Sequence, residues 1–385
     1  MHEPKGHVAR KFRILLISHL YPRNDWDIST TRALHNFVRI WESQCEVLVV
    51  RTVHTSPKRP FAHSWISKGT VEGIPVYSAI VLSMLKARIL LPIGPLALLA
   101  WKRFNPDVIV AHMKPNYRWA GRLAKLFHIP FIAGIHGSDV LGSVPCSLSA
   151  VERADLVAFR SPAIAERFHL LYPELSARVF IANSGIDASE ILPEAAFKKK
   201  AELWLGKTRF ISVSKLLPGK NHELVLRGLA SLQQKDWVYV IVGDGPLEDS
   251  LIELSRKLGL DQRVSFRGWL PRGAALDEME RSQVFLMPSA PETFGLAYLE
   301  AMSKGCVAVC AEGWGVDGII RDGVDGFTVK LPGLTEMTCL LSRLLELSPA
   351  RKMELLASVR ILIGNLTEEA VALRYLEEIR TLAQG

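Results

Sequence analysis

The chain alternates between short, continuous runs of apolar residues and segments whose apolar residues recur every three or four positions. A continuous apolar run that ends at a turn residue is typical of a strand buried on both faces, as in a parallel sheet covered by helices. In the helical segment at 34–41, Leu34, Phe37, Val38 and Trp41 form one apolar face. Strands are predicted within the stretches 12–22, 45–53, 106–112, 131–140, 154–161, 178–187, 208–214, 238–246, 263–270, 284–287 and 306–313.

Two stretches depart from this alternation. Residues 52–80 are rich in Pro, Gly and Ser, and we expect them to be irregular. Ile89 to Trp101 is an apolar run of 13 residues that contains Pro92, whereas a helix needs about 20 residues to span a bilayer. The run is therefore predicted to be a core helix, and the alternative is an element that lies on a membrane surface, flanked by Lys86, Arg88, Lys102 and Arg103.

Length and cysteine content define the broad class. A chain of 385 residues is too long for one usual core and indicates two domains. Five cysteines without the spacing of a metal site or a disulfide framework indicate a reducing cytoplasm and no bound metal. The apolar run at 14–18 is too short for the core of a signal peptide, so it is predicted to be the first strand.

Positive charge is concentrated near the N-terminus. The first 125 residues hold 19 Lys and Arg against 7 Asp and Glu, a net charge of +12, whereas the whole chain carries +8. A basic half suggests an anionic partner such as a membrane surface or a lipid diphosphate, although a merely solvated basic surface is the alternative. Nucleic acid is not expected as a partner, because the basic segment lacks interleaved aromatic residues.

Residues 284–305 contain a strand, a turn and a helix start in close succession. The apolar run Val284–Met287 ends at Pro288, and from Gly295 onward the apolar residues have helical spacing, up to a stop at Gly305. We expect the helix to begin near Thr293. The backbone N–H groups of its first turn would then be free to bind a phosphate at the positive end of the helix.

Two carboxylates flank this helix start. Glu292 lies at its mouth and Glu300 lies eight residues further on, which corresponds to an axial separation of roughly 12 Å. That distance is too long for a pair of glycosidase acids, but it suits the two ends of an extended ligand. A diphosphate between two hydroxyl-bearing rings, each held by one carboxylate, describes a nucleotide sugar.

The Glu-x-Phe-Gly of residues 292–295, with a second Glu at 300, resembles the motif of retaining glycosyltransferases of family four, which have the two-domain GT-B fold. The resemblance implies that Glu292 contacts hydroxyls of the donor sugar, that Glu300 binds the ribose, and that the backbone of Phe294, Gly295 and Leu296 binds the diphosphate. It also implies that His136, in the His-Gly-Ser-Asp after a strand, faces the donor sugar.

A second loop resembles the family's Gly-Arg followed by a Lys. Ser214 and Lys215 replace the Gly-Arg pair, and Lys220 keeps the second basic position. Two cations after a strand can clamp a diphosphate and stabilise the departing nucleotide, although Lys lacks the two-pronged guanidinium of Arg. The turn Gly243, Asp244 and Gly245 could let the backbone approach the donor.

The resemblance implies a GT-B α/β fold in which two Rossmann-like domains with parallel sheets face a central cleft. The predicted parts are an acceptor-side domain at 1–192, a linker at 193–207, a nucleotide-sugar-binding domain at 208–366 and a C-terminal helix at 367–385 that crosses back to the first domain.

The predicted enzyme is a retaining glycosyltransferase that moves a hexose from a nucleotide sugar to a saccharide or lipid-linked acceptor in the synthesis of surface polysaccharide or glycolipid. It needs no metal or further cofactor and works in the cytoplasm or on the inner membrane face. The alternatives are a nucleotide-sugar epimerase or hydrolase of the same fold, and a catalytically degenerate binding domain.

Overall fold

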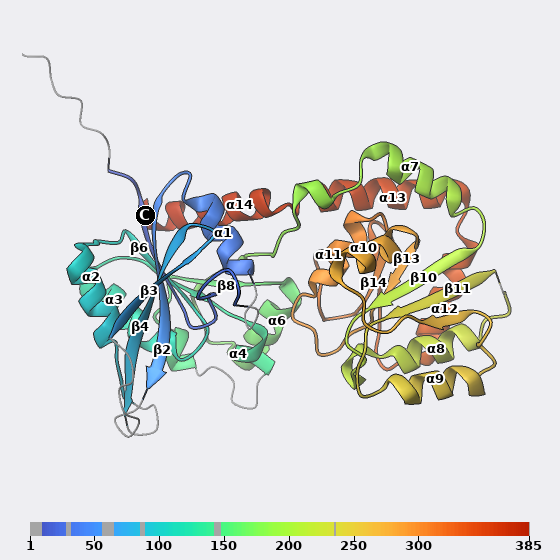
Figure 1. Ribbon diagram of the computed structural model, residues 1–385, viewed down its shortest axis with the longest axis horizontal. Helices are drawn as coiled ribbons and strands as arrows, with labels where there is room; N and C mark the ends of the chain where they lie inside the picture. The colour runs from blue at the N-terminus through green and yellow to red at the C-terminus, as the bar shows by residue number, and fades with distance from the viewer. Residues whose placement is uncertain are drawn as a thin grey trace, which may run out of the picture. The chain divides into compact units, whose positions relative to one another are not determined.

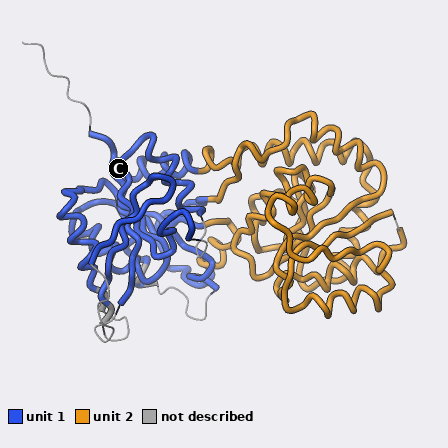
Figure 2. Tube along the Cα trace, in the orientation of Figure 1, with its two compact units in different colours: residues 1–159, 169–182, 372–385 blue, residues 160–168, 183–371 orange. Residues whose placement is uncertain are grey.

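The chain forms two compact units, each assembled from separate stretches (Figure 2). The first unit holds residues 1–159, 169–182 and 372–385, and the second holds 160–168 and 183–371. The computed structural model describes residues 10–27, 32–55, 65–84, 89–141, 148–234 and 236–384 (Figure 1).

The first unit is built on a largely parallel sheet with the strand order β3-β4-β2-β1-β6-β7-β8-β9, in which β3 and β5 run antiparallel to β4. Its central strands are buried on both faces, as the continuous apolar runs predict; every residue from Val108 to Ala111 has no exposed surface. The strands are β1 (Arg13–Ser18), β2 (Glu46–Thr55), β3 (Ile66–Val71), β4 (Ile74–Met84), β5 (Ile89–Leu91), β6 (Val108–His112), β7 (Phe131–Gly134), β8 (Leu156–Phe159) and β9 (Arg178–Ile181).

The expectation of an irregular segment at 52–80 is wrong for its described part, because β3 and β4 form a hairpin there. Glu72 and Gly73 both have positive φ, 48° and 83°, which is the backbone conformation of the tight turn that joins twisted antiparallel strands. The Gly and Ser content concealed strands that begin with alternating buried positions, as at Ile74 and Val76 on either side of the exposed Pro75.

Helices of the first unit pack around this sheet (Figure 1). The predicted apolar face at 34–41 is confirmed, since Leu34, Phe37, Val38 and Trp41 of α1 are buried. The helices are α1 (Ala33–Trp41), α2 (Ile93–Lys102), α3 (Asn116–Phe127), α4 (Gly137–Leu141) and α5 (Leu148–Val151), with parts of α6 (Pro162–Leu171) and α14 (Glu368–Gln384).

Most of α14 belongs to the first unit. Tyr375 packs edge-on against Phe37 and Trp41 and stacks on Phe180. The indole N–H of Trp41 donates a hydrogen bond to the carbonyl of Ala372 at 2.8 Å. This aromatic cluster fastens the last helix to the first unit.

The second unit has a parallel sheet with the strand order β12-β11-β10-β13-β14-β15. Two parallel-sheet α/β units therefore confirm the predicted fold class. The strands are β10 (Thr208–Val213), β11 (Trp237–Val242), β12 (Val264–Phe266), β13 (Val284–Leu286), β14 (Val307–Ala311) and β15 (Gly326–Val329). The helices are α7 (Glu194–Leu203), α8 (His222–Ala230), α9 (Glu248–Lys257), α10 (Arg272–Glu280), α11 (Leu296–Ser303), α12 (Leu334–Glu346) and α13 (Pro349–Gly364), with short 3-10 turns at Ala188–Glu190 and Pro218–Lys220.

The segment 193–207, predicted to be a linker, lies within the second unit and contains α7. Lys200, at the end of its triple lysine, is only 5% exposed. Its ammonium donates hydrogen bonds to the carbonyls of Met279, at 3.3 Å, and Lys304. The run of three lysines, which resembles a solvated linker, therefore includes one buried cation. Its ammonium satisfies backbone carbonyls at the C-terminal ends of α10 and α11.

Candidate functional site

Three loops of the second unit meet where β10, β11 and β13 end, because neighbouring parallel strands share one carboxyl edge. The amide of Asn221 donates to the carbonyl of Pro288 at 2.7 Å, and the N–H of Ala290 donates to Gly219 at 2.8 Å. The N–H of Leu216 donates to the backbone carbonyl of Asp244 at 2.8 Å. These bonds hold the three predicted site loops as one platform.

Lys220 and Glu292 form an ion pair at the centre of this platform. The Lys220 ammonium lies 2.7 Å from the Glu292 carboxylate, and the two side chains are 21% and 14% exposed. The other carboxylate oxygen accepts a hydrogen bond from the N–H of Thr293 at 3.0 Å. The structure thus brings together the predicted sugar-binding carboxylate and one predicted diphosphate cation.

The second predicted cation has a different environment. Lys215 is exposed, and among the described residues its ammonium has no hydrogen-bond or ion-pair partner. Its charge is therefore available to a ligand, whereas the Lys220 ammonium already contacts Glu292.

The glycines of the predicted turn allow close packing of the protein backbone. A Cβ atom on Gly243 would lie 1.9 Å from the carbonyl oxygen of Ser214, and one on Gly245 would lie 2.6 Å from that of Leu216. The turn around Asp244 thus supports the loop that carries Lys215. Its close approach is to this loop, and its predicted contact with a donor stays a prediction.

The helix within residues 284–305 begins at Leu296, three residues later than expected. Gly295 precedes it with φ 79°, and a Cβ there would lie 2.7 Å from the Tyr298 ring. No described residue accepts a hydrogen bond from the N–H groups of Phe294, Gly295 or Leu296. Since the side chain of Phe294 is buried, the group that it can offer a ligand is its backbone amide, at the positive end of α11.

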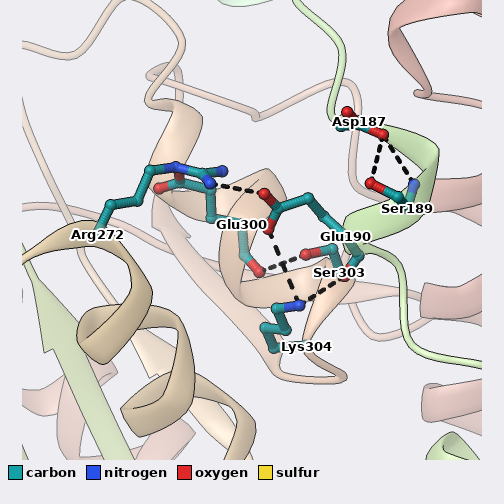
Figure 3. A network of polar contacts seen from close by, with 7 residues as sticks. All are labelled: Asp187, Ser189, Glu190, Arg272, Glu300, Ser303 and Lys304. Carbon is teal, nitrogen blue, oxygen red and sulfur yellow. Dashed lines mark hydrogen bonds and ion pairs between the residues drawn. The ribbon is translucent and has the colours of Figure 1, made fainter.

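Glu300 is held by an ion-pair network that the sequence motif does not reveal (Figure 3). The Arg272 guanidinium, at the start of α10, lies 2.9 Å from Glu300 and 2.6 Å from Glu190. Lys304 donates to the carbonyl of Glu190 at 2.8 Å. Arg272 is 55% exposed and Glu300 is 22% exposed, so a ligand hydroxyl could replace one of these contacts.

His222 is a buried residue that contacts the loop of Lys215 and Lys220. Its Nε2 atom lies 3.0 Å from the hydroxyl of Ser214, and its Nδ1 atom lies 3.4 Å from that of Tyr239. Burial is the main cause that lowers the pKa of His222 to about 4, and the nearby positive charge of Lys220 adds to this effect. The imidazole is therefore neutral at pH 7 and acts as a hydrogen-bonding strut.

His136 lies in the first unit, directly after β7. Its Nε2 atom is 3.0 Å from the Nδ1 atom of His112, at the end of β6, and the two rings meet edge to face. A Cβ on Gly134 would lie 2.1 Å from the His112 ring. The buried ring of His112 therefore occupies the space that the absent side chain of Gly134 leaves. Its contact with His136 fixes the orientation of that imidazole.

Asp139 holds the backbone of the same loop. Its carboxylate accepts hydrogen bonds from the N–H of His136 at 2.9 Å, the N–H of Lys114 at 3.1 Å and the hydroxyl of Tyr117 at 2.8 Å. Complete burial raises the pKa of Asp139, and these hydrogen bonds oppose that shift. The carboxylate thus aligns the loop that presents His136.

No cluster of three His, Cys, Asp or Glu residues that could hold a metal occurs among the described residues. The prediction that the reaction needs no metal is a statement about chemistry and stays a prediction. Likewise, no helix in the described part of the chain is both long and apolar enough to cross a bilayer.

Four supporting residues escaped the sequence analysis, namely Glu190, Arg272, His222 and Asp139. Each contacts a predicted site residue or its loop. Arg272 and Glu190 lie far along the chain from Glu300, so no spacing links them. Asp139 gave a detectable signal, because an acidic residue in the first turn of a helix can accept a hydrogen bond from the N–H of the residue that precedes the helix, as in a capping box.

Two family models match the chain in succession. The model described as Glycosyltransferase Family 4 matches residues 30–190, and the model described as Glycosyl transferases group 1 matches residues 194–354.

Among curated relatives, the lipopolysaccharide core biosynthesis glycosyltransferase LpsE of Rhizobium meliloti is 27% identical over 281 residues, which cover 72% of this chain and 76% of that protein. The D-inositol 3-phosphate glycosyltransferase of Kribbella flavida is 28% identical over 199 residues. That match covers 48% of this chain and 47% of the relative, so it spans about half of the relative's length.

Among solved structures, Anabaena HepE in complex with UDP has a TM-score of 0.67 and 18% identity, covering 96% of this chain and 100% of that one. The apo form of the lipopolysaccharide outer core galactosyltransferase WaaB has a TM-score of 0.69 and 16% identity, covering 96% and 99%. At these identities the likeness shows the fold.

The low pKa of His222 makes stability depend on pH. Between pH 6.5 and about pH 4 the unfolded chain binds a proton that the folded protein does not, so the free energy of unfolding falls as the pH falls through this window. Replacing His222→Gln keeps a hydrogen-bonding group and removes this site's contribution, at most about 3 kcal/mol. Urea unfolding at pH 7.5 and pH 4.5 should show a smaller difference in the variant than in the wild type.

The matched control is His128→Gln, because His128 is exposed. It should leave the pH dependence unchanged. If His222→Gln retains the full wild-type difference between the two pH values, the imidazole is not held neutral in the folded protein.

Proposed function

Because the chain belongs to the family-four glycosyltransferases of the GT-B fold, we propose that it transfers a hexose from a nucleotide diphosphate sugar to an acceptor hydroxyl with retention at the anomeric carbon. The acceptor is a saccharide or a lipid-linked saccharide, in the synthesis of cell-surface polysaccharide or glycolipid. The observation that carries the proposal is the pairing of Lys220 with Glu292 beside three unbonded amides at the start of α11.

The donor diphosphate is assigned to the cationic side of this platform. Lys215 has no competing partner among the described residues, and the amides of Phe294, Gly295 and Leu296 add the positive end of a helix. When Lys220 turns to the diphosphate, the carboxylate of Glu292 becomes free to accept hydrogen bonds from sugar hydroxyls. Donor binding would therefore exchange one ion pair for two charge-assisted contacts.

Glu300 is assigned to the ribose at the far end of the donor. A ribose presents two neighbouring hydroxyl groups, and the partly exposed Glu300 can accept from both. Arg272, which contacts both Glu300 and Glu190, keeps that carboxylate oriented before the donor arrives.

His136 is assigned to the donor sugar. The edge-to-face contact with His112 and the bond from its N–H to Asp139 fix the ring and the backbone of the loop. A fixed imidazole can accept or donate one hydrogen bond to a sugar hydroxyl without first losing conformational freedom.

In the proposed reaction the bond between the anomeric carbon and the diphosphate oxygen breaks, and its electron pair stays with the diphosphate. The acceptor oxygen bonds to the same face of the anomeric carbon, and its proton passes to the departing phosphate. Lys215, Lys220 and the α11 amides stabilise the charge that develops on the diphosphate, and losing one such donor typically costs about 3 to 4 kcal/mol of transition-state stabilisation.

Two observations on similar proteins support a sugar nucleotide and a glycan product. HepE, which shares the fold, was crystallised with UDP, and LpsE is named for lipopolysaccharide core biosynthesis. We infer an acceptor of that general class and a reaction on the cytoplasmic side, where nucleotide sugars are made.

Donor binding can be detected without knowing the acceptor. A donor that binds only the folded protein at a hundredfold excess over its Kd should stabilise it by about 2.7 kcal/mol. We expect thermal unfolding with UDP-, GDP- and ADP-sugars to show a shift for one nucleotide, and Glu300→Gln should weaken it. The matched control Glu253→Gln, in an exposed ion pair with Lys257 on α9, should leave the shift intact.

A donor that binds but yields only free sugar or an epimer, with every saccharide acceptor offered, would identify a hydrolase or epimerase instead. The absence of a shift with all three nucleotides would favour a degenerate binding domain.

The close contact between Gly134 and the His112 ring provides a test of the role of His136. Gly134→Ala places a Cβ on the His112 ring, so both imidazoles must move. Displacing a positioned group can cost roughly 10²-fold in kcat, whereas nucleotide affinity should stay at its wild-type value, because the nucleotide contacts belong to the second unit. Turnover and calorimetric binding of the nucleotide diphosphate measure the two effects.

The control for that experiment is Gly364→Ala, where no atom lies within 4 Å of the added Cβ. A Gly134→Ala enzyme with wild-type turnover would contradict a role for the two histidines in transfer.

A further inference from the structure

The outward face of α2 is apolar from Ile93 to Trp101. Leu98 and Leu99 are buried and fix the helix to the first unit, next to β4. The residues on the opposite side are also apolar: Ile93, Leu96 and Trp101 are 40%, 42% and 65% exposed. A helix on the surface of a soluble domain normally turns polar side chains outward, so this face requires a reason.

Cations border this apolar face at its C-terminal end. Lys102 is the last residue of α2 and Arg103 follows it, and both are exposed. The Lys102 ammonium lies 4.6 Å from the centre of the Trp101 ring and 5.0 Å from that of Tyr77. The indole is thus held between the apolar face and a positive charge.

An aromatic residue also marks the other end of the helix. Trp65 is 42% exposed, and its carbonyl accepts a hydrogen bond from the N–H of Ile80 on β4. The same carbonyl would lie 2.9 Å from a Cβ placed on Gly94, at the start of α2. Tryptophans at both ends of an apolar surface are typical of proteins that sit at the boundary between lipid headgroups and acyl chains.

We propose that this surface, formed by Ile93, Leu96, Trp101, Lys102 and Arg103 and here named the α2 face, docks on an anionic lipid bilayer. The apolar side chains would enter the headgroup boundary while the two cations meet lipid phosphates. Charge complementarity selects this occupant, because the first 125 residues carry 19 Lys and Arg against 7 Asp and Glu. Lys86 and Arg88, which the sequence analysis placed on the other flank, lie outside the described residues.

The run from Ile89 to Trp101 is not the single element that was predicted, because Ile89–Leu91 form strand β5 and the helix α2 begins at Ile93. One side of α2 belongs to the core, as expected of a core helix, and the other side has the composition of a membrane-surface element. With 10 residues the helix is far shorter than a bilayer span, so it would lie in the plane of the interface. Binding of this kind needs no sugar donor and is independent of the proposed reaction.

Co-sedimentation of the full chain with vesicles tests the proposal. We expect binding to phosphatidylcholine vesicles that contain phosphatidylglycerol, and little binding to phosphatidylcholine alone. Each cation near an anionic surface contributes about fivefold to the binding constant, so Lys102→Gln with Arg103→Gln should weaken binding about 25-fold. Leu96→Ser with Trp101→Ser should weaken it by at least as much.

The matched control is Trp269→Ser, which removes a tryptophan of similar exposure, 68%, from the second unit. It should bind as the wild type does. Thermal unfolding should show one cooperative transition for every variant, because the substituted side chains lie outside the buried core.

Three outcomes would overturn the proposal. One is equal binding to neutral and anionic vesicles, and another is wild-type binding by both double variants. The third is a dimer in sedimentation velocity that Leu96→Ser with Trp101→Ser dissociates while vesicle binding is absent, which would make the α2 face a contact between two copies of the chain.

Discussion

The ion pair between Lys220 and Glu292 is the interaction on which the candidate donor site depends. It joins two loops that follow different strands of the second unit, and both side chains are mostly shielded from water. A partly buried charge that loses its partner is costly, so neither residue can change its contact unless another charged or polar group replaces it. In the proposed function, a nucleotide diphosphate sugar supplies both replacements, a phosphate for the lysine and hydroxyl groups for the glutamate.

The surrounding structure holds this pair at one edge of the sheet. Neighbouring parallel strands end at the same edge, and hydrogen bonds between the loops after β10, β11 and β13 make the edge continuous. Two glycines let the loop of Asp244 touch the loop of Lys215, and the neutral His222 supports Ser214 from the interior. The positions of the loops that carry the charged residues therefore depend on backbone contacts and on one uncharged histidine.

In the first unit, His136 is likewise positioned by close packing and by hydrogen bonds. His112 occupies a space left by Gly134, and the buried Asp139 gathers backbone N–H groups around His136. The imidazole is therefore oriented by residues of the same unit. Its orientation does not require a donor to be bound.

Much of this could be predicted from the sequence because the relevant signals are local. Continuous apolar runs identified the parallel strands, and the spacing of Glu292, Gly295 and Glu300 identified the helix start, although the helix begins at Leu296 and not near Thr293. Local patterns could not reveal partners that lie far along the chain, such as Arg272 and Glu190 beside Glu300. They also failed where composition misled, as in the β3–β4 hairpin and at the buried Lys200.

The most direct test of the account is calorimetric binding of the nucleotide diphosphate to the wild type, to Lys220→Met and to Glu292→Gln. If donor binding takes Lys220 away from Glu292, Lys220→Met should weaken nucleotide binding roughly tenfold to a hundredfold. Glu292→Gln should leave it unchanged or tighten it, because the competing carboxylate charge is gone, while sugar transfer is lost. Equal weakening by both substitutions would contradict the account, since it would show that the pair only holds the two loops together.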